Sequence, residues 1–211
     1  MYSDVKNKIK MYLDYIEIGT SDFDTLLETT NLHGISIEPL SIYLDRLPNK
    51  ENNIKLNAAV SDFDGECDIF YISPEDIIKH NLPNWLRGCN SILKPHPTAL
   101  SVLNKMGLVN LYQQKKIDVL TWDTLIRTKN IVGVDYLKID TEGHDSIIIK
   151  SILESNTNVL PKKIKFETNV LTTNNAIIET INLLKDRGYF IIEKTDLNTV
   201  VEFDPFLETR K

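Results

Sequence analysis

The chain has 211 residues, of which 42% are hydrophobic and 26% are charged. This composition is typical of a globular protein with a full core and excludes an intrinsically disordered chain. Its formal net charge is −6, from 24 basic and 30 acidic side chains, and this disfavours a nucleic-acid partner because phosphate contacts need clustered lysine and arginine.

The hydrophobic segments are short. None approaches the roughly 20 residues that cross a bilayer, and the first residues lack the apolar stretch of a secretory signal. We therefore expect one cytoplasmic domain over residues 1–211, with no membrane partner. The two cysteines, Cys67 and Cys89, lack CxxC spacing, so the sequence predicts neither a zinc site nor a disulfide framework.

The first third of the chain alternates apolar runs with turns. Strands are predicted over residues 14–19, 53–62 and 67–72, and a further short strand that contains Ile35 and Ile37 is predicted to end at Glu38-Pro39. The segment 20–30 between the first two strands predicts a helix capped by Ser21 or Asp22. The turn Asp64-Gly65 predicts a hairpin between the third and fourth strands.

Regularity weakens over residues 73–116. Four prolines interrupt the pattern, namely Pro74, Pro83, Pro95 and Pro97, and proline breaks the interior of long elements. We interpret this stretch as an insertion. Long irregular connections inside compact domains are usually functional or disordered.

Alternation returns after the insertion. A buried strand is predicted over 134–140, a helix over 145–155, a strand over 164–168, a helix over 174–188 and two strands over 189–195 and 199–203. In the second helix Ile177, Ile181 and Leu184 share one face. Alternating strands and helices followed by a terminal hairpin predict an α/β fold, with a mostly parallel doubly wound sheet and one antiparallel strand.

The first strand and turn have the layout of a nucleoside site. Gly19 ends the strand, and Glu38, about twenty positions on, could accept hydrogen bonds from ribose hydroxyls. The dinucleotide pattern GxGxxG is missing, and Asp22 and Asp24 would repel a pyrophosphate. The turn therefore favours a nucleoside with a cationic centre, such as S-adenosylmethionine, although a purely structural glycine gives the same pattern.

Four segments extend this reading when taken in order: YIEIGTSDFD, GISIEP, NAAVSDFDG and LKIDTEGHD. Together they resemble the FkbM-type family of S-adenosylmethionine-dependent methyltransferases, over Tyr15 to Thr168. The resemblance implies a Rossmann-like class I methyltransferase fold with a seven-stranded sheet. It also implies an O-methyltransferase, which moves a methyl group to a hydroxyl oxygen of a small molecule such as a sugar or glycosylated compound.

The resemblance also assigns cofactor-binding residues by position. They are Glu17, Gly19 and Thr20 at the methionine end, Glu38 at the ribose, and Ala59 with Asp62 beside the adenine. One departure is Phe23, which stands where the family often has a second glycine in the first motif.

The strand end LKIDTEGHD supplies the candidate catalytic residues Asp140, Glu142 and His144. His144 is the expected base because its ordinary pKa lies near neutral pH, and either carboxylate could orient it or bind the acceptor. In the alternative reading Asp140 only caps the next helix and His144 is exposed. Glu167, at the end of the next strand, is predicted to face the acceptor.

A divalent metal is the competing interpretation of this cluster. An extended chain would project Asp140, Glu142 and His144 to one side, where Glu167 could complete an oxygen-rich site. Gly143 instead favours a turn that would scatter these side chains. We therefore expect no metal.

The insertion is predicted to cover the acceptor. Trp85 could stack on a sugar ring, and Arg87, Asn90, Ser91 and His96 offer polar contacts. The alternative is a surface loop anchored by Trp85. Two other functions stay open at this stage: a nucleoside-binding module without catalysis and an NAD-dependent oxidoreductase.

Overall fold

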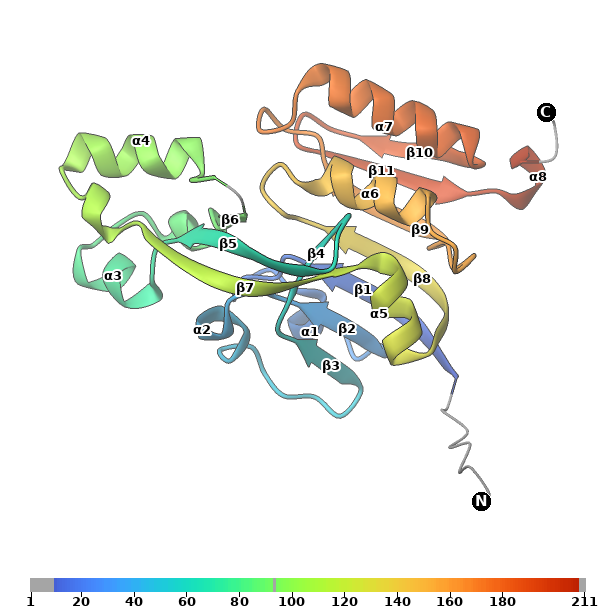
Figure 1. Ribbon diagram of the computed structural model, residues 1–211, viewed down its shortest axis with the longest axis horizontal. Coiled ribbons are helices and arrows are strands. Elements are labelled where there is room, and N and C mark those ends of the chain that lie inside the picture. Colours follow the sequence, from blue (N-terminus) through green and yellow to red (C-terminus); the bar gives the residue numbers. More distant parts are fainter. Residues whose placement is uncertain (1–9, 93, 209–211) are drawn as a thin grey trace.

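A seven-stranded sheet forms the centre of the protein (Figure 1), which we describe from a computed structural model over residues 10–92 and 94–208. Its strand order is β10-β11-β9-β8-β1-β2-β3. The strands are β1 (Met11–Ile18), β2 (Gly34–Ile37), β3 (Asn53–Leu56), β8 (Ile131–Ile139), β9 (Lys163–Glu167), β10 (Tyr189–Lys194) and β11 (Asn198–Phe203).

The sheet is parallel from β3 to β9, and β11 runs antiparallel to its neighbours β9 and β10. The predicted α/β class with a mostly parallel sheet is confirmed. The carboxyl ends of β1, β2, β8 and β9 therefore lie along one edge, where ligands bind in open α/β sheets.

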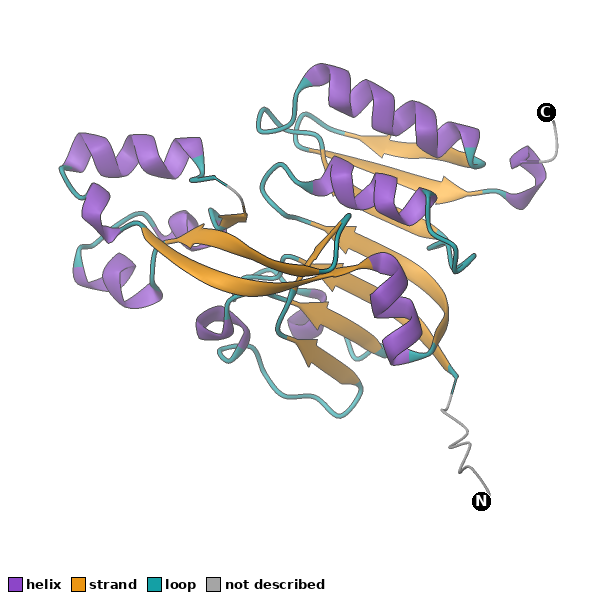
Figure 2. Cartoon of the chain, in the orientation of Figure 1, coloured by secondary structure: helices purple, strands orange, loops and turns teal. Residues whose placement is uncertain are grey.

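Three helices lie in a row over one face of this sheet (Figures 1 and 2). They are α5 (Trp122–Lys129), α6 (Asp145–Leu153) and α7 (Asn174–Asp186). The predicted apolar face of α7 is buried, with Ile177, Ile181 and Leu184 in the main core. The strand order continues in one direction from β8 through β9 to β10, and crossovers between parallel strands are right-handed as a rule, which accounts for α6 and α7 lying on the same face.

The first predicted helix is wrong in its length and its cap. The helix α1 covers only Leu26–Thr29, and Thr25 caps it in place of Ser21 or Asp22. Residues 19–25 instead form a loop in which Ser21 and Asp24 have positive φ angles of 48° and 54°. A second short helix, α2 (Ser41–Leu44), follows β2.

A smaller, four-stranded sheet was not predicted. Its order is β4-β7-β5-β6, built from β4 (Ala59–Ser61), β7 (Gln113–Thr121), β5 (Gly65–Tyr71) and β6 (Ser91–Ile92). The single strand expected over 53–62 is therefore wrong, because β3 and β4 belong to different sheets. The Asn57 side chain lies at this break and donates a hydrogen bond to the Glu38 carbonyl at 2.9 Å.

The expected hairpin at Asp64-Gly65 is also wrong. The strand β7 lies between β4 and β5, parallel to the first and antiparallel to the second. The turn is tied to β7, since the Asp64 carboxylate accepts the Thr121 backbone N–H at 2.8 Å. A pairing with a strand some fifty residues away has thus replaced the local one.

The insertion is more regular than its prolines suggested. It contains α3 (Pro74–Lys79), η1 (Asn84–Gly88), α4 (Pro97–Met106) and η2 (Val109–Leu111), which gather at one end of the molecule (Figure 2). Pro74 and Pro97 occupy first helical positions, where proline is favoured. The segment has its own core cluster, which includes Ile77, Leu86 and Leu103.

The last helix is α8 (Pro205–Glu208). None of the helices in the described ranges is long and apolar enough to cross a bilayer.

Candidate active site

A cavity of about 520 Å³ lies at the carboxyl ends of β1, β2 and β8. This volume is in the range of small-molecule sites. Ten of the predicted site residues line it: Gly19, Thr20, Glu38, Ala59, Trp85, Asn90, Asp140, Glu142, His144 and Glu167. Five do not: Glu17, Asp62, Arg87, Ser91 and His96.

Gly19 meets a structural demand in the first turn. Its φ angle is +80°, and a Cβ atom there would lie 1.9 Å from the carbonyl oxygen of Asp140. Only glycine lets the ends of β1 and β8 approach this closely. Strand packing therefore requires a glycine here, whether or not a ligand also approaches its backbone.

Glu38 is held rigidly at the end of β2. It is buried, and its two carboxylate oxygens accept the backbone N–H groups of Ser21 at 2.8 Å and Leu40 at 2.9 Å. Burial raises the pKa of Glu38 to about 7. Each oxygen keeps a second lone pair, so both can still accept a ligand hydroxyl.

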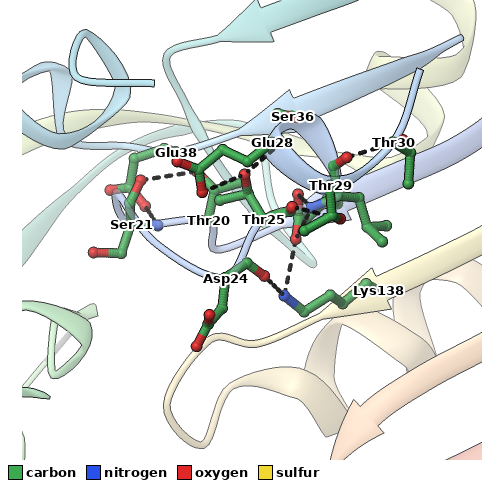
Figure 3. A network of polar contacts seen from close by, with 12 residues as sticks. Thr20, Ser21, Asp24, Thr25, Glu28, Thr29, Thr30, Ser36, Glu38 and Lys138 are labelled. Carbon is green, nitrogen blue, oxygen red and sulfur yellow. Dashed lines mark hydrogen bonds and ion pairs between the residues drawn. The ribbon is translucent and has the colours of Figure 1, made fainter. Parts of the chain in front are cut away.

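Glu17 supports the first turn together with Lys138, which lies next to Asp24 (Figure 3). It is fully buried, accepts the Leu26 N–H at 2.9 Å and pairs with the Lys138 ammonium at 2.9 Å. Lys138 also donates to the Asp24 carbonyl at 3.0 Å. Burial raises the pKa of Glu17. These contacts hold the loop 19–25 in place and explain why it is not helical.

The loop after β8 makes the turn that Gly143 predicted. Glu142 has a φ angle of 54° and Gly143 one of 96°. The turn does not scatter the cluster, because Asp140, Glu142 and His144 all line the same cavity. The structure thus brings the three predicted side chains together by a bend in the chain.

Asp145, which was not assigned a role, fixes this loop. It is fully buried and accepts the backbone N–H groups of Thr141 at 3.0 Å and of Glu167 at 2.8 Å. The alternative in which Asp140 caps the helix is wrong, since His144 stands at the N-cap position of α6 without a side-chain cap bond. His144 is also buried, not exposed.

Three carboxylates share this end of the cavity: Asp140, Glu142 and Glu167. Burial, with the neighbouring carboxylates adding to it, raises the pKa of Asp140 to about 6 and that of Glu167 to about 9. The Oε2 atom of Glu167 is buried and has no hydrogen-bond partner in the described ranges. Such a surface favours a ligand that carries positive charge or hydroxyl donors.

His144 belongs to a chain of three side chains. Its Nε2 lies 2.9 Å from Ser61 Oγ, and the Ser61 hydroxyl donates to Asp62 Oδ1 at 3.0 Å. Because the serine proton goes to Asp62, we assign the proton of the neutral ring to Nε2 and a free lone pair to Nδ1. Burial lowers the pKa of His144, so the ring is neutral at pH 7.

Ser61 was missed as a site residue. It lies inside a predicted strand and carries no distinctive spacing, so nothing local marked it. Asp62, expected beside the adenine, is exposed and instead acts through Ser61.

Arg87 clamps the insertion to the first turn and does not line the cavity. Its guanidinium lies 3.4 Å from the Asp22 carboxylate and 4.4 Å from the centre of the Phe23 ring. Its carbonyl accepts the Ser21 hydroxyl at 2.8 Å. Trp85 is 47% exposed and lines the cavity, so its ring is available to a ligand.

Within residues 10–92 and 94–208, three side chains of metal-ligand type come together: Cys89, His96 and Glu142, with one ligand atom of each within 4.8 Å of the others. They are not the set proposed from sequence, of which only Glu142 is shared. His96 Nε2 lies 3.0 Å from Glu142 Oε2, and burial raises the pKa of the Cys89 thiol to about 12. The thiol is therefore protonated in this arrangement.

Comparison with known proteins bears on the identity of this site. The family described as the methyltransferase FkbM domain matches residues 15–191. That range includes the smaller sheet, the insertion, the parallel strands from β3 to β9 of the larger sheet except the start of β1, and every residue that lines the cavity except Leu197. No curated protein and no solved structure matches significantly. The chain therefore belongs to the FkbM-domain family of methyltransferases.

Proposed function

We propose that this protein is an S-adenosylmethionine-dependent O-methyltransferase. Its acceptor would be a hydroxyl oxygen of a small polyhydroxylated molecule, a sugar or a glycosylated compound. The observation that carries the proposal is the neutral, buried His144, which Ser61 and Asp62 orient at the carboxylate-lined end of the cavity.

The cavity suits the two ends of an adenosyl donor. Ala59, Val60 and Ile69 offer apolar surface to a flat ring, and the fixed carboxylate of Glu38 lines the same cavity. Asp140 and its neighbouring carboxylates suit a cationic centre. When bound, S-adenosylmethionine supplies an electrophilic methyl group.

The chain's own residues would then position and deprotonate the acceptor. His144 Nδ1 takes the hydroxyl proton, and Ser61 accepts the hydrogen bond from Nε2 that keeps the ring in this tautomer. Glu142 accepts a hydrogen bond from a further hydroxyl, and Glu167, which is protonated at neutral pH, donates one. Trp85 stacks on the apolar face of a sugar ring. Most of the rate enhancement comes from alignment of the acceptor oxygen with the methyl group.

The donor is tested by thermal shift with S-adenosylmethionine, S-adenosylhomocysteine, NAD and ATP. We expect both adenosyl ligands to raise the melting temperature and E38A to abolish the effect. The exposed Glu193 provides the matched control, E193A, which should respond like the parent chain. Stabilisation by NAD alone would indicate an oxidoreductase and refute the proposal.

Catalysis is tested by methyl transfer to methyl α-D-glucopyranoside and its p-nitrophenyl analogue, followed by mass spectrometry. We expect turnover without added metal. Tight binding of S-adenosylhomocysteine with no product on these or other polyols would favour a non-catalytic nucleoside-binding module.

A further inference from the structure

His96 stands outside the cavity but touches one of its carboxylates. It is 4% exposed, lies at the N-cap of α4, and its backbone N–H donates to the Tyr112 hydroxyl at 2.8 Å. Its Nε2 lies 3.0 Å from Glu142 Oε2. This is the only side-chain hydrogen bond that joins the described part of residues 73–112 to the loop 140–144.

The other ring nitrogen fixes where the proton lies. Nδ1 accepts the backbone N–H of Ala99 at 3.3 Å, as the cap of α4. A nitrogen that accepts cannot carry the proton of a neutral ring. Nε2 therefore carries it and donates to Glu142. A metal bound through Nε2 would force the proton onto Nδ1 and break the cap.

Glu142 needs such a partner. Its φ angle of 54° lies in the left-handed region. Residues other than glycine adopt this backbone conformation only when their surroundings enforce it. With Oε2 held by His96, the side chain is fixed while it lines the cavity.

We propose that His96 is a positioning residue, which holds the Glu142 carboxylate in the acceptor region and couples the insertion to the reacting loop. This inference rests on the proposed function and deepens it. It gives His96 a different role from the direct acceptor contact expected from sequence.

Two substitutions separate the roles of the two nitrogens. Asparagine is a good N-cap but is too short to reach Glu142, so H96N keeps the helix cap and loses the carboxylate contact. Glutamine places its amide N–H near the position of Nε2, so H96Q restores the contact and loses the cap. H80N, in the same segment but away from the cavity, is the control.

We expect H96N to lower kcat on methyl α-D-glucopyranoside by about 10- to 100-fold, as small misplacements do. The KM of the acceptor and the affinity for S-adenosylhomocysteine should not change. H96Q should recover part of the lost rate, and the control H80N should keep the parent rate. Combining H96N with E142Q should cost no more than E142Q alone. Multiplied effects of the two substitutions would contradict the coupling.

The tautomer gives a readout that needs no turnover. Long-range ¹H–¹⁵N spectra of the histidine rings should show His96 protonated at Nε2, with a resonance that moves in E142Q. Protonation at Nδ1, or activity that EDTA abolishes and zinc restores, would overturn the proposal in favour of a metal site. An increase in acceptor KM alone in H96N would overturn it in favour of direct contact.

These outcomes remain distinct from failure of the proposed function. If S-adenosylhomocysteine does not bind the parent chain, the donor assignment fails. The spectra still decide the hydrogen bond between His96 and Glu142 in that case.

Discussion

At the scale of single residues, neighbours decide what each ionisable group can do. Asp140, Glu142 and His144 were found from sequence because they follow an apolar strand. The sequence did not show which of the three acts as the base, because that depends on Ser61, about eighty residues away in the chain. The partner that makes His144 a candidate base comes from the smaller sheet.

The assignment of His144 predicts the pH dependence of the reaction. Burial lowers the pKa of this group below its ordinary 6.5, so the base should be active at neutral pH and lose activity as it is protonated in acid. We expect kcat to hold at neutral pH and to fall only at a pH below 6.5, and H144N to lower kcat by about 10²- to 10⁴-fold.

S61A is the matched test of orientation in the same assay. It should cost less than H144N and leave the affinity for S-adenosylhomocysteine intact. If H144N retains most of the parent rate, the proton goes to another group.

Glu167 predicts a stability effect that does not depend on function. Its carboxyl titrates near 4.5 when unfolded and near 9 in the fold. Between these values the folded state holds a proton that the unfolded state has lost, so stability falls as pH rises. E167Q removes this penalty and should raise the melting temperature at pH 8.5 by about 2–4 °C, the shift for about 1 kcal/mol in a chain of this size.

Melting curves at pH 5.5, 7 and 8.5 check this expectation. The difference between E167Q and the parent chain should grow with pH. Parallel pH profiles for the two proteins would show that Glu167 is not protonated in the fold.

At the scale of elements, strong periodicity was a reliable guide and local turn signals were not. The helix α7 was predicted from its apolar face at helical spacing, and the strand β8 from its near-continuous apolar run. The hairpin predicted at Asp64-Gly65 was wrong because β7, a distant segment, lies between the two strands. The helix predicted over 20–30 was wrong over its first half because Glu17 and Glu38 accept backbone N–H groups of this segment.

Where the ends of β1 and β8 meet, adding one methyl group at Gly19 is predicted to destabilise the protein severely. In G19A the new Cβ would overlap the Asp140 carbonyl, at 1.9 Å, in addition to the strain of φ +80°. We expect the free energy of unfolding to fall by about 3–5 kcal/mol. Urea denaturation followed by circular dichroism measures the change.

G107A is the matched control, because Gly107 also has positive φ, +69°, but has nothing within 4 Å of the added atom. It should cost only about 1–2 kcal/mol. Equal losses in the two variants would mean that the approach of β1 to β8 is looser than described.

At the scale of the whole molecule, the insertion is a second small core fastened to the first turn through Arg87. R87A removes the nearer partner of the largely buried Asp22 carboxylate, whose other cation, Arg46, lies 3.9 Å away. We expect a loss of about 1–3 kcal/mol of stability and weaker binding of S-adenosylhomocysteine, because Ser21 and Phe23 line the cavity.

Calorimetric titration and thermal melting measure both effects. R127A provides the comparison, since the exposed pair of Arg127 and Asp123 at 3.2 Å spans one helical turn and should be worth about 0.5 kcal/mol or less. Unchanged ligand affinity in R87A would show that the clamp does not shape the cavity.

The sequence by itself determined the fold class, the family resemblance and the strand end at Asp140, because these depend on periodicity and on motifs contiguous in the chain. Only the tertiary structure decided which side chains pair across the cavity. The pairs of His144 with Ser61 and of His96 with Glu142 join segments 83 and 46 residues apart. Such contacts leave no periodic signal in the sequence. They form only when the smaller sheet and the insertion pack against the loop that follows β8 in the larger sheet.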